Sequence, residues 1–244
     1  MDYNKLIEKR DYVKENIDKL DKNILLNYQT DFDVEFIHNS TAIEGNTLTL
    51  IETKLLIEDK FSVGSKALRE IYEIINHNKA WNYVKTSIQE NKDLNEDMVK
   101  DLHSILMENI MVGGIYRTVE VRITGAKHTP PTPNDAYNEL KNFFETLGNL
   151  EYNEFELAAY THAEFVKIHP FVDGNGRTSR TIMNYQLLKK GFLPVSIKKE
   201  NKLKYYEVLD EYAVNGNLKP FTEMLYDLEM EQLDFYSRAI KEVE

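Results

Sequence analysis

Residues 169–180 read His-Pro-Phe-Val-Asp-Gly-Asn-Gly-Arg-Thr-Ser-Arg, and the organisation of the chain can be worked out from this stretch outward. Pro170 disfavours helical geometry in the residue before it, so the apolar-periodic segment upstream is predicted to be a helix that ends near Ile168. A second helix is predicted to begin near Gly176 and to cover residues 176–190. The stretch is therefore a short loop that ends at the positive end of a helix.

This loop is predicted to bind an anion. Two glycines flank Asn175 in a tight turn that opens a helix, which leaves several backbone N–H groups directed at one spot. Arg177 and Arg180 are three residues apart in the first turn of that helix. Both side chains can therefore lie on one face and donate to the same anion.

Two further side chains give the anion site a chemistry. Asp173 is the only carboxylate of the loop, and beside phosphates its natural partner is Mg²⁺. His169 opens the loop, where a neutral imidazole can take a proton from an incoming hydroxyl. Each piece alone is common in ordinary turns and on ordinary surfaces. Together, in this order and within twelve residues, they predict nucleotidyl or phosphoryl transfer.

The rest of the chain is predicted to be mostly helical, because apolar residues recur at three- and four-residue spacing, first in a segment that runs to Leu25. The further predicted helices cover residues 32–44, 49–59, 66–90, 95–110, 134–148, 153–168, 176–190, 200–213 and 218–242. Residues 115–133 differ, since apolar and polar side chains alternate there between glycines and prolines, which predicts a short two-stranded hairpin. No internal repeat or flexible linker divides the chain. The fold class predicted is all-α, one helical domain with a hairpin flap.

Composition excludes several classes of protein. The 244 residues include 41 acidic and 30 basic side chains, for a net charge of -11, which argues against sequence-independent binding of nucleic acid. There is no cysteine, so disulfides, thiol nucleophiles and Cys-ligated metals are excluded. No apolar run approaches the roughly 18 residues of a membrane helix, and the N-terminus has no signal-like segment. We therefore expect a soluble, cytoplasmic protein with no membrane partner.

The twelve residues match, at every fixed position, the pattern H-x-F-x-[DE]-G-N-G-R-x-x-R, and the chain thereby resembles the Fic family (filamentation induced by cAMP). Members of that family typically transfer AMP from ATP onto a protein hydroxyl. The resemblance implies a Fic-type helical bundle in one compact unit. Its parts would be an N-terminal extension (1–94), the family core (95–225), whose flap (115–131) aligns a target backbone by strand addition, and a C-terminal helix (226–244).

The resemblance also assigns roles within the loop. His169 would be the general base for the Ser, Thr or Tyr hydroxyl of a target protein. Phe171 would anchor the loop in the core. Asp173 would hold the Mg²⁺ that bridges the α- and β-phosphates of ATP.

The remaining roles concern the nucleotide. Arg177 and Arg180 would bind the β- and γ-phosphates. The phosphates would be cradled by Gly174, Asn175 and Gly176, and Asn175 would stabilise the charge that develops at the α-phosphorus. Because the family places an aromatic residue and an Asn after the motif helix, the candidates for contact with adenine are Tyr205, Tyr206 and Asn215. The two tyrosines can equally be core residues.

A second motif lies near the N-terminus, where residues 40–45 read Ser-Thr-Ala-Ile-Glu-Gly. Ser40 and Glu44 are four residues apart and share a helical face. The helix dipole disfavours a carboxylate at the last turn, so Glu44 is expected to pair with a cation. The alternative is that Glu44 lies at a solvated helix end. The segment matches the family's inhibitory pattern [ST]-x-x-x-E-[GN]. This resemblance implies an inhibitory helix at about 34–45, whose Glu44 pairs with Arg180 and blocks productive binding of ATP.

The resemblance leaves the reaction partly open. Removal of AMP from a modified target and transfer of another phosphate-containing group are alternatives at the same site. An ATP-sensing interaction module without turnover is an alternative of a different class. The target protein is not identified by the sequence, and self-modification and homo-oligomerisation both stay open. The five other histidines show no ligand spacing and are predicted to be core or surface residues, with contact of the flap's His128 with a target left open: His38, His77, His103, His128 and His162.

Overall fold

The computed structural model describes residues 1–61 and 64–243. Within these residues the regular secondary structure is helical, and there is no strand. Two 3₁₀ turns, at Ile17–Lys19 and Lys199–Asn201, accompany the α-helices. The helices are α1 (Tyr3–Asn16), α2 (Lys22–Ile43), α3 (Leu50–Ile57), α4 (Leu68–Gln89), α5 (Glu96–Leu106), α6 (Pro133–Thr146), α7 (Glu154–Ile168), α8 (Asn175–Lys189), α9 (Lys202–Asn215) and α10 (Lys219–Lys241). The all-α prediction is confirmed.

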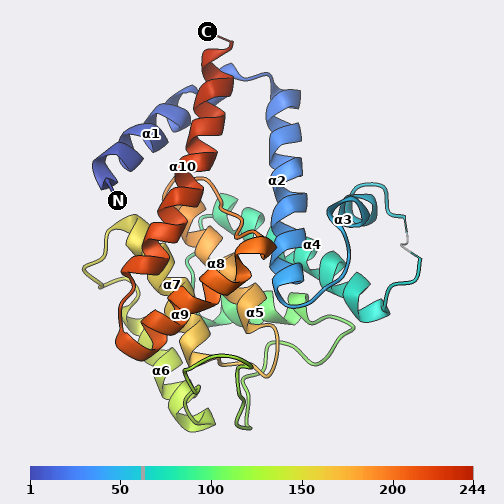
Figure 1. Cartoon of the computed structure of the whole chain (residues 1–244), viewed down its shortest axis with the longest axis vertical. Helices are drawn as coiled ribbons and strands as arrows, with labels where there is room; N and C mark the ends of the chain where they lie inside the picture. The colour runs from blue at the N-terminus through green and yellow to red at the C-terminus, as the bar shows by residue number, and fades with distance from the viewer. Residues whose placement is uncertain (62–63, 244) are drawn as a thin grey trace.

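The central helices are α7 and α8, which pack on each other and lie between two apolar cores. One core joins α7 and α8 to α1, α9 and α10, and the other joins them to α4, α5 and α6. Figure 1 shows α8 near the middle of the molecule, with α1 alongside α10 and with α3 standing out beside α2 and α4. The loop at the start of α8 is anchored in the second of these cores through Phe171.

Local side-chain caps explain where most helices begin. Thr49 and Asn153 form capping boxes at the starts of α3 and α7, and Thr132 caps α6, whose first residue is Pro133. Helices α4, α8, α9 and α10 begin without a side-chain cap, and the N-cap of α8 is Gly174 in the left-handed region (φ 79°). The first N–H groups of α8 therefore lack a capping side chain, at the place where the sequence predicts an anion.

The N-terminal boundaries differ from the prediction. The first periodic segment, predicted to run to Leu25, is interrupted by the 3₁₀ turn, and α2 begins at Lys22 rather than near residue 32. The cause is Asp21, whose side chain accepts hydrogen bonds from the backbone N–H groups of Asn23 and Ile24 and so starts a new helix. The predicted inhibitory helix is the last part of α2, which ends at Ile43.

The hairpin predicted at 115–131 is not confirmed. The segment contains turns but no strand, and a buried arginine within it, Arg117, bonds to carbonyls inside and outside the segment. The backbone N–H of Arg117 donates to the carbonyl of Pro170, and its guanidinium donates to the carbonyls of His169, Val119 and Pro131. The segment is therefore fastened to the catalytic loop as an irregular flap.

Two further predictions concern the ends and the surface of the chain. The predicted C-terminal segment 226–244 falls within α10 and the residues just after it, apart from residue 244, which lies outside the described residues. Within the residues that the structure describes, no helix combines the length and the apolar composition needed to cross a bilayer.

Candidate active site

The backbone of the 169–180 loop reverses sharply between α7 and α8. His169 adopts the left-handed conformation (φ 52°, ψ 58°), and its N–H donates to the carbonyl of Phe165 over 3.0 Å to close α7. Asn175 then clamps the turn, because its amide accepts from the N–H of Phe171 (2.9 Å) and donates to the carbonyl of Phe171 (2.8 Å). Such strained backbone persists only where its surroundings over-determine it.

Phe171 anchors the loop as predicted. Its ring is fully buried and stacks on the imidazole of His103 with the ring centroids 3.6 Å apart. His103 in turn donates from Nε2 to the carbonyl of Asp173 (2.9 Å) and accepts at Nδ1 from the N–H of Gly114 (2.8 Å). One neutral imidazole therefore connects the catalytic loop to the flap. Burial lowers the pKa of His103 to about 4, which keeps this tautomer uncharged at neutral pH.

Both predicted phosphate arginines are buried, each with a side chain no more than 2% exposed. Arg177 lies 3.7 Å from a carboxylate oxygen of Glu73 and 3.5 Å from one of Asp173. Its Nε and Nη1 atoms are buried and have no hydrogen-bond partner among the described residues. Because a buried donor without a partner is costly, these atoms fit an anionic ligand that would accept from them.

Arg180, by contrast, has a full set of partners. Its Nε donates to Ser40 Oγ (2.9 Å), and its Nη2 donates to the carbonyl of Ser40 (2.7 Å) and to Glu44 Oε1 (2.7 Å). Its Nη1 donates to the hydroxyl of Tyr205 over 3.2 Å. The hydroxyl of Ser40 also forms a hydrogen bond with Nε2 of the buried His77 (2.8 Å). Ser40 and Glu44 thus share the face that their spacing predicts, and both contact Arg180.

Glu44 follows the last residue of α2 and reaches over the start of α8. A Cβ atom on Gly176 would lie 2.2 Å from Glu44 Oε1 and 3.1 Å from Arg180 Nη1. Only glycine at position 176 therefore leaves room for the carboxylate where it sits. The next residue, Gly45, has a φ of +105°, which lets the chain turn away immediately after Glu44.

His169 is arranged as a base. Its Nδ1 lies 3.2 Å from the carbonyl of Val166 and must donate to it, because a carbonyl oxygen can only accept. This fixes the tautomer in which Nε2 carries the free lone pair. Burial is the main cause that lowers the pKa of His169 to about 4, partly offset by the Val166 carbonyl and by the charge of Glu44. The imidazole is therefore neutral at physiological pH.

Asp173 is the one loop carboxylate and is 37% exposed. Its Oδ1 accepts from the N–H of Gly174 (2.6 Å), and its Oδ2 accepts from the guanidinium of Arg69 on α4. Burial alone would raise the pKa of Asp173, but Arg177, the Gly174 N–H and Arg69 together hold it below its usual range. The described residues hold no cluster of three or more metal-binding side chains. A single ionised carboxylate fits Mg²⁺ that is bound largely through a nucleotide, since Mg²⁺ commonly combines one or two carboxylates with phosphate oxygens.

Comparison with known proteins agrees with this geometry. Residues 93–187, which contain the loop and most of α8, match the sequence model described as the Fic/DOC family. This chain contains a Fic/DOC family domain. The proteins named protein adenylyltransferase Fic from Drosophila melanogaster and Drosophila persimilis are each 34% identical to it over 215 residues, or 86% of this chain. The chain spans 43% and 42% of those two relatives' lengths.

Solved structures extend the similarity beyond the Fic domain itself. A Fic domain containing signaling protein from Bacteroides thetaiotaomicron superposes with a TM-score of 0.87 at 25% identity, covering 99% of this chain and 98% of that one. Fic-1 (residues 134–508) from C. elegans superposes with a TM-score of 0.81 at 27% identity, covering 97% of this chain and 71% of that one. The N-terminal helices of this chain are thus part of the shared fold.

The three residues predicted to contact adenine are placed differently from one another around the Fic domain. Tyr205 is buried, and its hydroxyl is hydrogen-bonded to His162 Nε2 (2.8 Å) while accepting from Arg180, so it supports that arginine. Tyr206 is 38% exposed, and its hydroxyl donates to the carbonyl of Ile43 (3.4 Å). Asn215 is exposed at the end of α9 and donates to Glu211 on the same helix (2.8 Å). Contact of any of them with adenine stays a prediction.

The sequence analysis missed several residues that hold the Fic site together. The sequence predicts His77 and His103 to be core or surface residues, and it assigns no role in the site to Arg69 or Glu73. Each reaches the site from a helix far away in the sequence, and no spacing within its own helix marks it out. The only available signal was the placement of Arg69 in the first turn of α4, where the dipole disfavours a cation.

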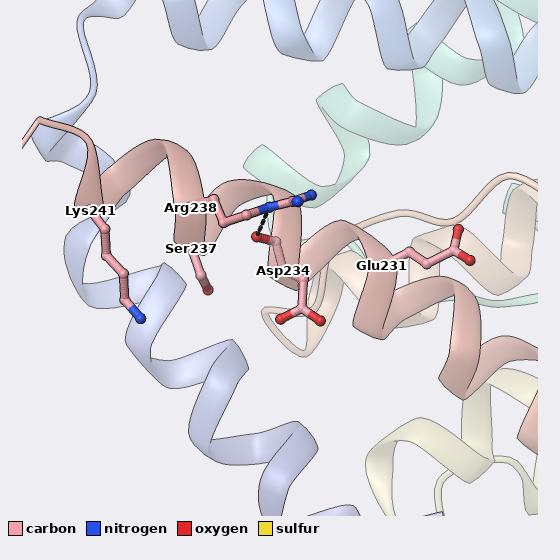
Figure 2. Close-up of a pocket in the computed structure, with 5 residues that line it drawn as sticks. All are labelled: Glu231, Asp234, Ser237, Arg238 and Lys241. Carbon is pink, nitrogen blue, oxygen red and sulfur yellow. Dashed lines mark hydrogen bonds between the residues drawn. The ribbon is translucent and has the colours of Figure 1, made fainter.

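A separate hollow of about 590 Å³ lies along the C-terminal half of α10 (Figure 2). Its lining side chains all come from that one helix: Glu231, Asp234, Ser237, Arg238 and Lys241. Within it, Arg238 Nε donates to the carbonyl of Asp234, whose side chain pairs with Lys9 of α1. None of these residues belongs to the predicted site.

Proposed function

We propose that this chain transfers AMP from ATP to a Ser, Thr or Tyr hydroxyl of a target protein. The proposal rests on the combination of two features. His169 is neutral with its Nε2 free, and two buried arginines lie beside the uncapped start of α8. The Drosophila relatives' name, protein adenylyltransferase Fic, supports the same reaction.

In this reaction the target hydroxyl oxygen attacks the α-phosphorus of ATP. The new bond joins that oxygen to phosphorus, the bond from the α-phosphorus to the bridging oxygen of the β-phosphate breaks, and pyrophosphate leaves. His169 Nε2 takes the hydroxyl proton. Arg177 and Arg180 would hold the β- and γ-phosphates and orient the chain of phosphates for attack. Asn175 clamps the loop through Phe171, and any direct contact of its amide with the phosphate stays part of the proposal.

Asp173 is the residue that would hold Mg²⁺, which when bound would neutralise phosphate charge as it develops. The carboxylate is ionised at neutral pH because its pKa lies below the usual range. Its place at the start of α8, next to Arg177, would set it beside the same phosphates.

In the absence of substrate, Glu44 inhibits the site, and its contact with Arg180 is called the brake below. The carboxylate occupies Nη2 of Arg180, the donor that the γ-phosphate would need, and it lies directly against Gly176 of the phosphate cradle. ATP can therefore bind with its full set of contacts only after Glu44 moves. The same carboxylate could position a water for removal of AMP, and that reaction is the second candidate at this site because Glu44 sits close enough to influence the pKa of His169.

The partners belong to the proposal as well. The irregular flap at 115–131 is fastened to His169 through Arg117, which makes it the segment best placed to receive a target chain. Modification of the chain itself and control by self-association are compatible with this arrangement. A cytoplasmic location follows only from the cysteine-free composition and is proposed on that basis.

The test compares wild type, Glu44→Gly and Glu44→Gly/His169→Ala, each incubated with Mg²⁺ and α-labelled ATP, with and without lysate. Intact-mass spectrometry detects added AMP. Glu90→Gly is the matched control, since Glu90 follows α4 as Glu44 follows α2 but is exposed and pairs with Lys92. We expect label only in Glu44→Gly. Equal label in the double variant would contradict the role of His169, and no label in any variant would redirect the assignment to AMP removal or to an ATP-sensing module without turnover.

A further inference from the structure

Arg69 connects helix α4 to the catalytic loop. It is the second residue of α4, and its side chain is 57% exposed. Its Nη2 donates to Asp173 Oδ2, while its Nε donates to Glu73 Oε1 one turn further along α4 (3.2 Å). The sequence separation between Arg69 and Asp173 is 104 residues, so the contact is created by the fold alone.

With this contact, each oxygen of Asp173 already accepts a hydrogen bond. Oδ1 accepts from the N–H of Gly174 and lies 3.5 Å from Arg177, and Oδ2 is taken by Arg69. The guanidinium of Arg69 therefore stands against the carboxylate that would hold Mg²⁺, and a divalent cation bound there must replace it. Two cations cannot share one carboxylate oxygen at close range without repulsion.

Arg69 keeps a second partner, Glu73, if its guanidinium leaves Asp173. Glu73 is nearly buried and is held by Asn46, whose amide donates to Glu73 Oε2 (3.0 Å). Rotation of the guanidinium away from Asp173 can keep the bond from Arg69 Nε to Glu73. Because most of the Arg69 side chain is already in water, leaving Asp173 costs it little desolvation or packing.

We propose that Arg69 is a positioning residue that competes with the divalent cation for Asp173 and so sets the affinity of the site for metal-bound nucleotide. The proposal rests on the proposed function through one premise, the metal-holding role of Asp173. The proposal predicts that removal of the Arg69 side chain increases the affinity of the site for the metal. Damage to the loop would instead decrease that affinity.

The test measures binding of Mn²⁺ to the full chain in the presence of saturating ADP, by the loss of the electron paramagnetic resonance signal of free Mn²⁺. The variants are Arg69→Ala, Arg69→Lys and Asp173→Ala. Lys79→Ala is the matched control, because Lys79 is a similarly exposed cation on α4 that pairs with Glu108 (2.6 Å) instead of with the loop's carboxylate. Calorimetry with ADP at several Mg²⁺ concentrations repeats the measurement with the physiological metal.

We expect Arg69→Ala to lower the Mn²⁺ dissociation constant about fivefold, the ratio that corresponds to one well-placed exposed ion pair. Arg69→Lys should restore most of the wild-type value, and Lys79→Ala should match wild type. An unchanged or weaker affinity in Arg69→Ala, with Asp173→Ala abolishing Mn²⁺ binding, would overturn the inference and leave the proposed site standing. Undiminished Mn²⁺ binding in Asp173→Ala would overturn the premise and the inference together.

Discussion

Replacement of Glu44 by Gln separates the charge of the brake from its bulk. Gln has nearly the size of Glu, so it still fills the space against Gly176 where a Cβ atom would come within 2.2 Å of the present carboxylate. It removes the negative charge that now faces Nη2 of Arg180 over 2.7 Å. If the brake is electrostatic, Glu44→Gln should release most of it.

The magnitude follows from the environment of the pair. Arg180 is almost fully buried, whereas the side chain of Glu44 is 34% exposed, so the pair is partly screened by solvent. A hydrogen bond between charged groups contributes about 1.5–3 kcal/mol, and screening reduces this to about 1–2 kcal/mol here. Because ATP must displace Glu44, Glu44→Gln should raise kcat/KM for ATP about 5- to 30-fold.

The assay is the initial rate of incorporation of α-labelled AMP, measured over a series of ATP concentrations below saturation. Wild type, Glu44→Gln, Glu44→Gly and Glu44→Asp are compared, and the Glu90→Gly control is included. An increase in Glu44→Gly with none in Glu44→Gln would refute the electrostatic reasoning and assign the brake to occupancy of the cradle. No increase in either variant would refute the brake.

Three other predictions test separate parts of the structure. Gly176→Ala should raise the labelling rate in the wild-type background by expelling the Glu44 carboxylate and should give no further increase in Glu44→Gly; equal increases in both backgrounds would contradict this. Since burial lowers the pKa of His169 to about 4, the rate of the activated variant should stay level from pH 7.5 to 5.5, and a half-loss near pH 6.5 would count against the buried base. Burial raises the pKa of Glu229 to about 8, above the usual value of the unfolded chain, so its contribution to stability is present below about pH 4.5 and is lost as pH rises toward 8. Glu229→Gln should therefore stabilise the protein at pH 8 by roughly 3–5 kcal/mol and much less at pH 5, measured by chemical unfolding with the exposed Glu231→Gln as control.

The helix boundaries at the centre of the fold could be predicted because proline and glycine mark them in the sequence. Pro170 fixes the end of α7, which closes at Ile168, and the two glycines of the loop allow α8 to begin at Asn175, one residue from the predicted start. Spacing alone also places Ser40 and Glu44 on one face, and both contact Arg180. Local rules succeed here because each of these features depends on neighbours in the sequence.

Predictions failed where a distant or competing group decides the structure. The alternation of side chains at 115–131 is typical of a hairpin, but the guanidinium of Arg117 binds the carbonyls of Val119 and Pro131 within the segment and that of His169 outside it. At the N-terminus, apolar periodicity hid the break before α2, because the cap supplied by Asp21 is a single residue inside a periodic pattern.

Long-range contacts account for what the sequence could not show. His103 and Asp173 are 70 residues apart, yet the imidazole of one fixes the carbonyl of the other. The N–H of Gly114 at Nδ1 and the carbonyl of Asp173 at Nε2 decide the tautomer of His103, and neither contact follows from the residues around position 103. A structural histidine and a positioning histidine have the same local sequence signature.

The ionic contacts around the loop follow one pattern. Each charged side chain of the loop has a counter-charge supplied from the N-terminal helices: Arg180 by Glu44, Arg177 by Glu73, and the loop carboxylate by Arg69. A buried guanidinium without an opposite charge would cost several kcal/mol, so these pairs stabilise the chain while no substrate is bound. In the proposed function, magnesium and nucleotide phosphates would carry the same two kinds of charge and would replace the internal partners one for one. The residues proposed to restrain the site would then also be those that keep its charges balanced, which would couple release of the brake to arrival of the substrate.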